Sequence, residues 1–104
     1  MKNLRVALLQ LLPEGTLQAN LEKGLEACRN AKELGADIAL FPELWSIGYR
    51  LSSNINEMKK SAIPIDGEFV CAFAALAREL EMAIGITFLE EYSPAPRNTL
   101  CLFD

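Results

Sequence analysis

Short apolar runs alternate with longer amphipathic stretches along this chain. The run Ile38 to Phe41 holds four consecutive apolar residues, which is too short for a helix and typical of a buried strand. The ranges Leu4 to Leu11, Met82 to Leu89 and Leu100 to Phe103 also carry apolar residues on both faces of the expected strand, so both faces need burial. Two helix-length segments lie between these strands. The alternation predicts an α/β fold.

Each expected helix has its own boundary signals. Thr16 can cap the first helix, and Gly35 is expected to end it because glycine takes the left-handed conformation easily. Asp66 is the expected cap of the second helix, whose apolar face begins at Val70. A loop with one helical turn, near Ile55 to Lys60, is expected between the second strand and the second helix. The predicted order is βαβ-loop-αββ.

One face of the expected sheet has no cover within the chain. Two right-handed crossovers place both helices on the same face if the sheet grows in one direction. Four strands of about five residues present roughly 300 Å² in projection, already near the largest apolar patch usual on a monomer. The pattern therefore predicts a partner for that face, either a second copy of the chain or a C-terminal half of the same protein.

Composition narrows the classes of function. With 104 residues and 51% hydrophobic content, residues 1–104 are expected to form a single domain. A net charge of −4 argues against nucleic acid or an anionic membrane as partner, and no segment is long enough to span a bilayer. Three cysteines without C-x-x-C spacing favour a cytoplasmic setting. The chain has no histidine and its carboxylates lack ligand spacing, so we expect neither a metal nor another cofactor.

Glu43 stands just past the end of an expected strand. Pro42 ends that strand because it has no amide hydrogen for the ladder and restricts Phe41 to extended geometry. Ligands of open α/β sheets bind at the carboxyl ends of the strands, which makes Glu43 a candidate catalytic group. A solvated loop glutamate is an equally good interpretation of its position alone.

Three stretches of the chain carry a resemblance to a known family. The segment Phe41 to Tyr49, F-P-E-L-W-S-I-G-Y, resembles the first catalytic motif of the nitrilase (carbon–nitrogen hydrolase) superfamily. Gly85 to Glu91 resembles the G-x-x-x-x-E strand segment of that family, and Asn98-Thr99 resembles its N-T pair. The motifs occur in order, and the resemblance runs from Arg5 to Phe103.

This resemblance implies a fold and an activity. The family fold is an αββα four-layer sandwich, and this chain is similar to its N-terminal half, a sheet with two helices on one face. The family hydrolyses amide, carbamoyl or nitrile groups with a Glu general base, a Lys and a Cys nucleophile. Glu43 matches the base, while the Lys and Cys motifs would lie beyond Asp104. Residues 1–104 alone are therefore expected to be inactive.

Other residues are weaker candidates for the site. Glu90 resembles a second family glutamate that helps to order the site, and a strand-end surface charge is an equally good interpretation. Trp45 and Tyr49 follow the base and are candidates for the substrate pocket, although aromatic residues that leave a sheet more often pack. Cys28, Cys71 and Cys101 fall on helices or within a strand, and we expect them to pack as small apolar residues.

Two other classes of function remain as alternatives. The chain could be a catalytically silent fragment that serves as an association module. It could also be a small nucleotide-binding module, but the L-P-E-G-T segment after the first strand offers only one glycine and an acidic residue that would repel phosphate. The second alternative is therefore disfavoured.

Overall fold

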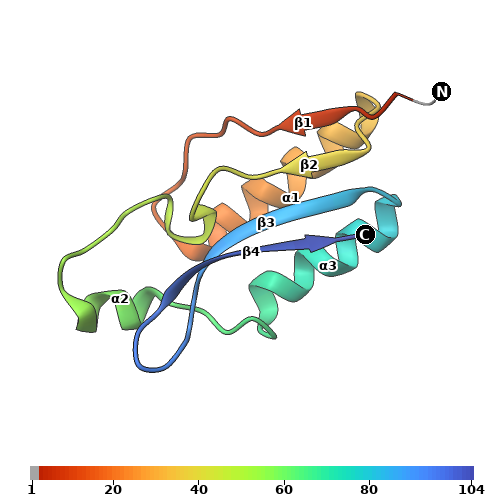
Figure 1. The fold of residues 1–104 in the computed structure, drawn as a ribbon. Coiled ribbons are helices and arrows are strands. Elements are labelled where there is room, and N and C mark those ends of the chain that lie inside the picture. Colours follow the sequence, from red (N-terminus) through yellow and green to blue (C-terminus); the bar gives the residue numbers. More distant parts are fainter. Residues whose placement is uncertain (1–2) are drawn as a thin grey trace.

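The computed structural model describes residues 3–104, which form a four-stranded sheet with two long helices on one face (Figure 1). In chain order the elements are β1 (Val6–Leu8), α1 (Leu17–Glu33), β2 (Ile38–Leu40), the 3₁₀ turn η1 (Trp45–Ile47), α2 (Ile55–Ser61), α3 (Glu68–Leu80), β3 (Ala83–Glu90) and β4 (Arg97–Phe103). The sheet order is β1-β2-β3-β4. The first three strands are parallel, and β4 is antiparallel to β3. The predicted α/β class and element order are confirmed.

The boundaries of α1 are those that the sequence predicts. The Thr16 hydroxyl accepts a hydrogen bond from the Ala19 amide at 3.1 Å. Gly35, just past the helix, has a φ of 89°. The short helix α2 also forms where one turn was expected. Local capping chemistry decides these positions, so tertiary packing did not change them.

The predicted cap of α3 was wrong. Gly67, not Asp66, occupies the N-cap position, and no side chain caps the helix. The Gly67 amide donates to the Pro64 carbonyl at 3.1 Å, which closes a tight turn before the helix. A Cβ at Gly67 would lie 2.8 Å from Pro64 Cγ, so the turn requires glycine there. The aspartate is thereby displaced one residue outside the helix.

Three strands differ in length from their predicted ranges. β2 ends at Leu40, one residue before the predicted end at Phe41. β1 is limited to Val6–Leu8, because β2, the strand that pairs with it within residues 3–104, is itself three residues long. β4 begins at Arg97 rather than at Leu100, because Arg97 pairs with Glu90 at the end of β3. Strand length in this sheet is thus determined by the neighbouring strand.

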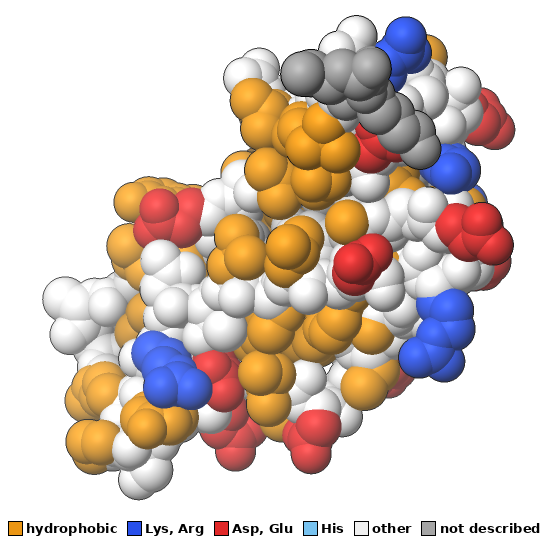
Figure 2. All heavy atoms as spheres, turned by 45° about the vertical axis from the view of Figure 1, so that its right-hand side comes forward, with side chains coloured by type: hydrophobic (Ala, Val, Ile, Leu, Met, Phe, Trp, Pro, Cys, Tyr) orange, Lys and Arg blue, Asp and Glu red, His pale blue; other side chains and the backbone are white. Residues whose placement is uncertain are grey.

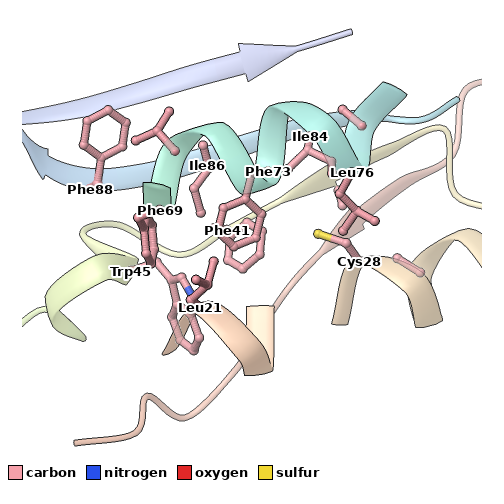
Figure 3. Close-up of a cluster of buried hydrophobic side chains, with 14 of the residues drawn as sticks. Leu21, Cys28, Phe41, Trp45, Phe69, Phe73, Leu76, Ile84, Ile86 and Phe88 are labelled. Carbon is pink, nitrogen blue, oxygen red and sulfur yellow. The ribbon is translucent and has the colours of Figure 1, made fainter. Parts of the chain in front are cut away.

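The hydrophobic core lies between the sheet and the helices α1 and α3 (Figure 3). Ile84, Ile86 and Phe88 of β3 have no exposed surface on this side, which we call the helix face. Phe73 of α3 meets Phe41 edge to face, with ring centroids 5.2 Å apart. α1 approaches closely at Gly24, where a Cβ would lie 2.9 Å from the ring of Phe73. Phe41 therefore anchors the end of β2 in the core.

The opposite side of the sheet, which we call the open face, carries exposed apolar side chains. Val6 and Leu8 of β1 and Leu100 and Leu102 of β4 are 43–70% exposed. Figure 2 shows hydrophobic side chains gathered over the middle of the molecule, with most charged groups toward its borders. Residues 3–104 provide no second layer here, as the sequence predicted. In the same part of the chain, no helix has the length and apolar character needed to cross a bilayer.

Candidate active site

The turn that follows β2 is fixed to β3 by one buried side chain. The Thr87 hydroxyl donates to the Pro42 carbonyl and accepts from the Trp45 amide, the latter at 3.0 Å. Thr87 is only 4% exposed. Leu44, between these two anchor points, has a left-handed φ of 52°, a conformation that costs a leucine about 1–2 kcal/mol. The contacts of Thr87 help to hold this strained turn in place.

A second set of hydrogen bonds fixes η1 to α1 and β3. Asn20 of α1 donates through Nδ2 to the Ser46 carbonyl at 3.3 Å, and Trp45 Nε1 donates to the Asn20 carbonyl at 2.9 Å. The Leu89 amide donates to Ser46 Oγ at 3.0 Å. Asn20 and Ser46 are almost fully buried. The turn that carries Glu43 is therefore held by two neighbouring elements.

Glu43 projects from this turn beside a concavity at one end of the open face. The concavity has a volume of about 360 Å³ and is lined by Phe41, Glu43, Thr87, Asn98 and Leu100. Asn98 of β4 donates through Nδ2 to Glu43 Oε1 at 2.9 Å. Among residues 3–104, Oε2 has no hydrogen-bond partner. Glu43 thus stands where the sequence placed it, just past the carboxyl end of β2, with one oxygen oriented and the other free.

Glu90 lies on the other side of the sheet. Side chains alternate between the two faces along β3, so Glu90 lies on the same face as Ile86 and Phe88, the helix face. It is 5% exposed, and its Oε1 accepts from Arg97 Nε at 2.9 Å and from Thr99 Oγ1 at 2.7 Å. These hydrogen bonds, that from Arg97 first, lower the pKa of the Glu90 carboxyl. The structure does not bring Glu90 into the concavity of Glu43.

Trp45 and Tyr49 also lie outside that concavity. Trp45 is 2% exposed and packs in the core against Phe41, with ring centroids 5.7 Å apart. Tyr49 is 57% exposed, at a left-handed position in the loop before α2. A contact of either residue with substrate stays a prediction.

Comparison with known proteins identifies the family. The model of the carbon–nitrogen hydrolase family matches residues 5–104. This chain belongs to the carbon–nitrogen hydrolase family. The match covers every described strand and helix, so the resemblance of the three motifs extends to the whole fold.

Relatives of the chain are longer proteins. Glutamine-dependent NAD(+) synthetase of Thermotoga maritima is 34% identical over 91 residues, which are 86% of this chain and 16% of that protein. N-carbamoylputrescine amidase of Oryza sativa subsp. japonica is 29% identical over 100 residues, or 95% of this chain and 33% of the amidase. An amidase from Nesterenkonia sp. shares the fold with a TM-score of 0.70 and 24% identity, over 97% of this chain and 38% of that one.

The cysteines and lysines of this carbon–nitrogen hydrolase chain differ in their surroundings. Cys71 was expected to pack as a small apolar residue, but it is exposed on α3, where its Sγ donates to the Asp66 carbonyl at 3.4 Å. Cys28 is fully buried, and burial raises the pKa of its thiol to about 12, which suppresses the nucleophilic thiolate. Burial also raises the pKa of Cys101. Lys59 and Lys60 lie at the end of α2 and line a different concavity. In residues 3–104, no three His, Cys, Asp or Glu side chains form a group that could hold a metal ion.

Sequence reasoning missed the residues that support Glu43. Asn98 was noted only as part of the N-T pair, because its contact with Glu43 depends on the register between β3 and β4. The apolar pattern of β3 by itself does not single out Thr87. The sequence signal for Thr87 is that a polar residue stands between the apolar Ile86 and Phe88. Asn20 gave a similar signal within α1.

Proposed function

We propose that this chain provides the general base of a hydrolase that cleaves the C–N bond of a small amide, and that Glu43 is this base. The observation that supports the proposal most strongly is the position of the Glu43 carboxylate. It borders a concavity at the carboxyl end of β2, on a turn held by Thr87, with Oε2 unoccupied. A carboxylate in this position can exchange a proton with a bound reactant.

The proposed reaction requires a cysteine nucleophile from outside residues 1–104. Glu43 Oε2 accepts the thiol proton as sulfur bonds to the amide carbon, and the carbon–nitrogen bond then breaks. The same carboxyl group returns the proton to the leaving amine. Water next attacks the thioester, with Glu43 accepting a proton from it, and the thiol is regenerated as the acid leaves. A lysine would stabilise the tetrahedral intermediates in both halves of the reaction.

Relatives support a small amide or carbamoyl compound as the substrate. One is a glutamine-dependent synthetase and another an N-carbamoylputrescine amidase. Structures of the Nesterenkonia amidase contain butyramide, or acrylamide added to its active site cysteine. A primary amide or carbamoyl nitrogen is common to these compounds. We further propose that the reaction takes place in the cytoplasm, where the free thiols of Cys28, Cys71 and Cys101 would stay reduced.

The test is to measure ammonia release from butyramide, glutamine and N-carbamoylputrescine. The protein is used as the cell makes it, with Glu43→Gln as the variant and the exposed Glu79→Gln as the matched control. Loss of a general base should lower kcat by about 10²–10⁴-fold on the substrate that is turned over. Activity of Glu43→Gln equal to that of Glu79→Gln would reject Glu43 as the base. Residues 1–104 alone should show no turnover, because the proposed nucleophilic cysteine and the lysine lie outside them.

A second candidate function is association through the open face. The exposed Leu8, Leu100 and Leu102 favour it, because each fully buried leucine stabilises a complex by roughly 1.5–3 kcal/mol. For residues 1–104 on their own, we propose that a second copy of the chain occupies this face. Association and catalysis are compatible, because Glu43 lies at the end of the open face rather than at its centre.

A further inference from the structure

We propose that Glu90 and Asn98 are positioning residues for Glu43: the Glu90 carboxylate holds β4 on the helix face and thereby keeps the Asn98 amide against Glu43 on the open face. This inference rests on the proposed function, because it assigns the two residues to the orientation of the same base. It also gives the buried Glu90 a role that does not require contact with substrate.

The register of the hairpin connects the two faces. Phe88, Leu89 and Glu90 of β3 pair with Thr99, Asn98 and Arg97 of β4, respectively. Side chains alternate along a strand, so Arg97 and Thr99 share the helix face, and Asn98 between them projects to the open face. One oxygen of Glu90 accepts hydrogen bonds from both Arg97 and Thr99. Glu90 therefore binds β4 immediately before and immediately after Asn98.

Asn98 needs such support because its own contact is weakly protected. The hydrogen bond from Asn98 to Glu43 lies at the surface. Asn98 is on β4 and Glu43 follows β2, and β3 lies between these two strands in the sheet. Water competes for an exposed hydrogen bond of this kind, and both side chains have alternative rotamers. Glu90 is buried, and donor and acceptor are both charged in its bond from Arg97, which makes the helix-face contact the stronger of the two.

The chemical consequence concerns which oxygen of Glu43 reacts. The Asn98 amide occupies Oε1 and leaves Oε2 available for the proton. An amide is neutral, so it orients the carboxylate without placing a positive charge beside a base. The arginine of this hairpin, Arg97, pairs with Glu90 on the far side of the sheet. The sheet thus separates the carboxylate that holds the strand from the carboxylate that we propose transfers protons.

The test combines kinetics with a spectroscopic measurement on the protein as the cell makes it. Asn98→Ala should lower kcat about 10–100-fold with little change in KM, because the base loses its orientation. Glu90→Gln and Thr99→Val should also lower kcat. Thr99→Ser keeps the hydroxyl and should retain most of the activity. Adding Glu90→Gln to Asn98→Ala should cause little further loss. Glu79→Gln and Asn30→Ala, both exposed and distant, are the matched controls.

Side-chain amide NMR signals of Asn98 provide a readout independent of catalysis. In Glu90→Gln and Thr99→Val these signals should move toward those of a free amide, and in Glu79→Gln they should not move. Unchanged Asn98 signals in both Glu90→Gln and Thr99→Val would overturn the inference. An unchanged kcat in Asn98→Ala would also overturn it. If Glu43→Gln is fully active, the proposed function fails, but the amide signals still decide whether Glu90 positions Asn98.

Discussion

The two faces of one sheet differ in what their side chains contact. On the helix face, Ile84, Ile86 and Phe88 are fully buried under α1 and α3. On the open face, Leu100 and Leu102 are more than half exposed, and Glu43 lies at the end of the same surface. The helix face therefore supplies most of the stability, while the open face carries the candidate chemistry. Thr87, on the open face, holds the turn that carries Glu43 through the Pro42 carbonyl and the Trp45 amide.

The largest loss of folding stability is expected from a substitution in the core under the helix face. Phe73→Ala should lower the free energy of unfolding by about 3–5 kcal/mol, because it removes a ring that contacts Phe41 and Phe69. Urea unfolding followed by circular dichroism measures the change. Leu34→Ala is the control, since Leu34 is 82% exposed and should change stability by less than about 0.5 kcal/mol. Similar losses in both variants would contradict the assignment of the core.

The next effect concerns the residue that fixes the Glu43 turn. Thr87→Val should cost about 1–3 kcal/mol, because it leaves the Pro42 carbonyl and the Trp45 amide without their partner. Thr87→Ser keeps the hydroxyl and should cost less. Urea unfolding compares the two variants. A valine variant as stable as wild type would show that the turn does not depend on this side chain.

Substitutions on the open face should change dimerisation of residues 1–104 more than their folding stability. At micromolar concentration, residues 1–104 should sediment as a concentration-dependent dimer. Leu102→Lys should weaken the dimer at least about tenfold, because a charge would enter an apolar interface. Leu34→Lys is the control, because Leu34 is an even more exposed leucine that lies outside this face. A compact monomer at all concentrations would refute association by a second copy.

The smallest effect is the pH dependence that Glu90 contributes. Its pKa in the folded protein is lowered by Arg97 and Thr99, so its stabilisation is present above the unfolded pKa of about 4.3. That stabilisation should be lost as the pH falls from there toward the folded pKa, and Glu90→Gln should remove this part of the pH dependence. In about 1 M salt, the contribution of the exposed Glu79–Arg29 pair should vanish, whereas that of Glu90 should persist. If salt weakened the contributions of Glu90 and of the Glu79–Arg29 pair equally, the burial of Glu90 would be contradicted.

Much of the fold could be predicted from the sequence because local chemistry decides it. Thr16 and Gly35 mark the ends of α1, and two-sided apolar strands indicate a sheet that needs two covers. The cap of α3 was misplaced because the turn from Pro64 to Gly67 depends on a close backbone approach that composition does not reveal. Likewise, the end of β1 depends on the length of β2.

The candidate site was predictable only in part. Pro42 places Glu43 past the end of β2, and this follows from the chain alone. The separation of Glu43 and Glu90 onto opposite faces follows from strand parity and from the register of β4, which a motif does not specify. Trp45, a pocket candidate by its position after the base, is held in the core by Asn20 and Phe41. Long-range pairing decided each of these outcomes.

The most direct test of the account is to compare the two carboxylates in one kinetic experiment. In the protein as the cell makes it, kcat for amide hydrolysis is measured for Glu43→Gln and Glu90→Gln. We expect kcat to fall about 10²–10⁴-fold in Glu43→Gln and clearly less in Glu90→Gln, because only Glu43 exchanges protons with the reactants. A loss for Glu90→Gln that equals or exceeds the loss for Glu43→Gln would contradict the assignment of the open-face carboxylate as the base.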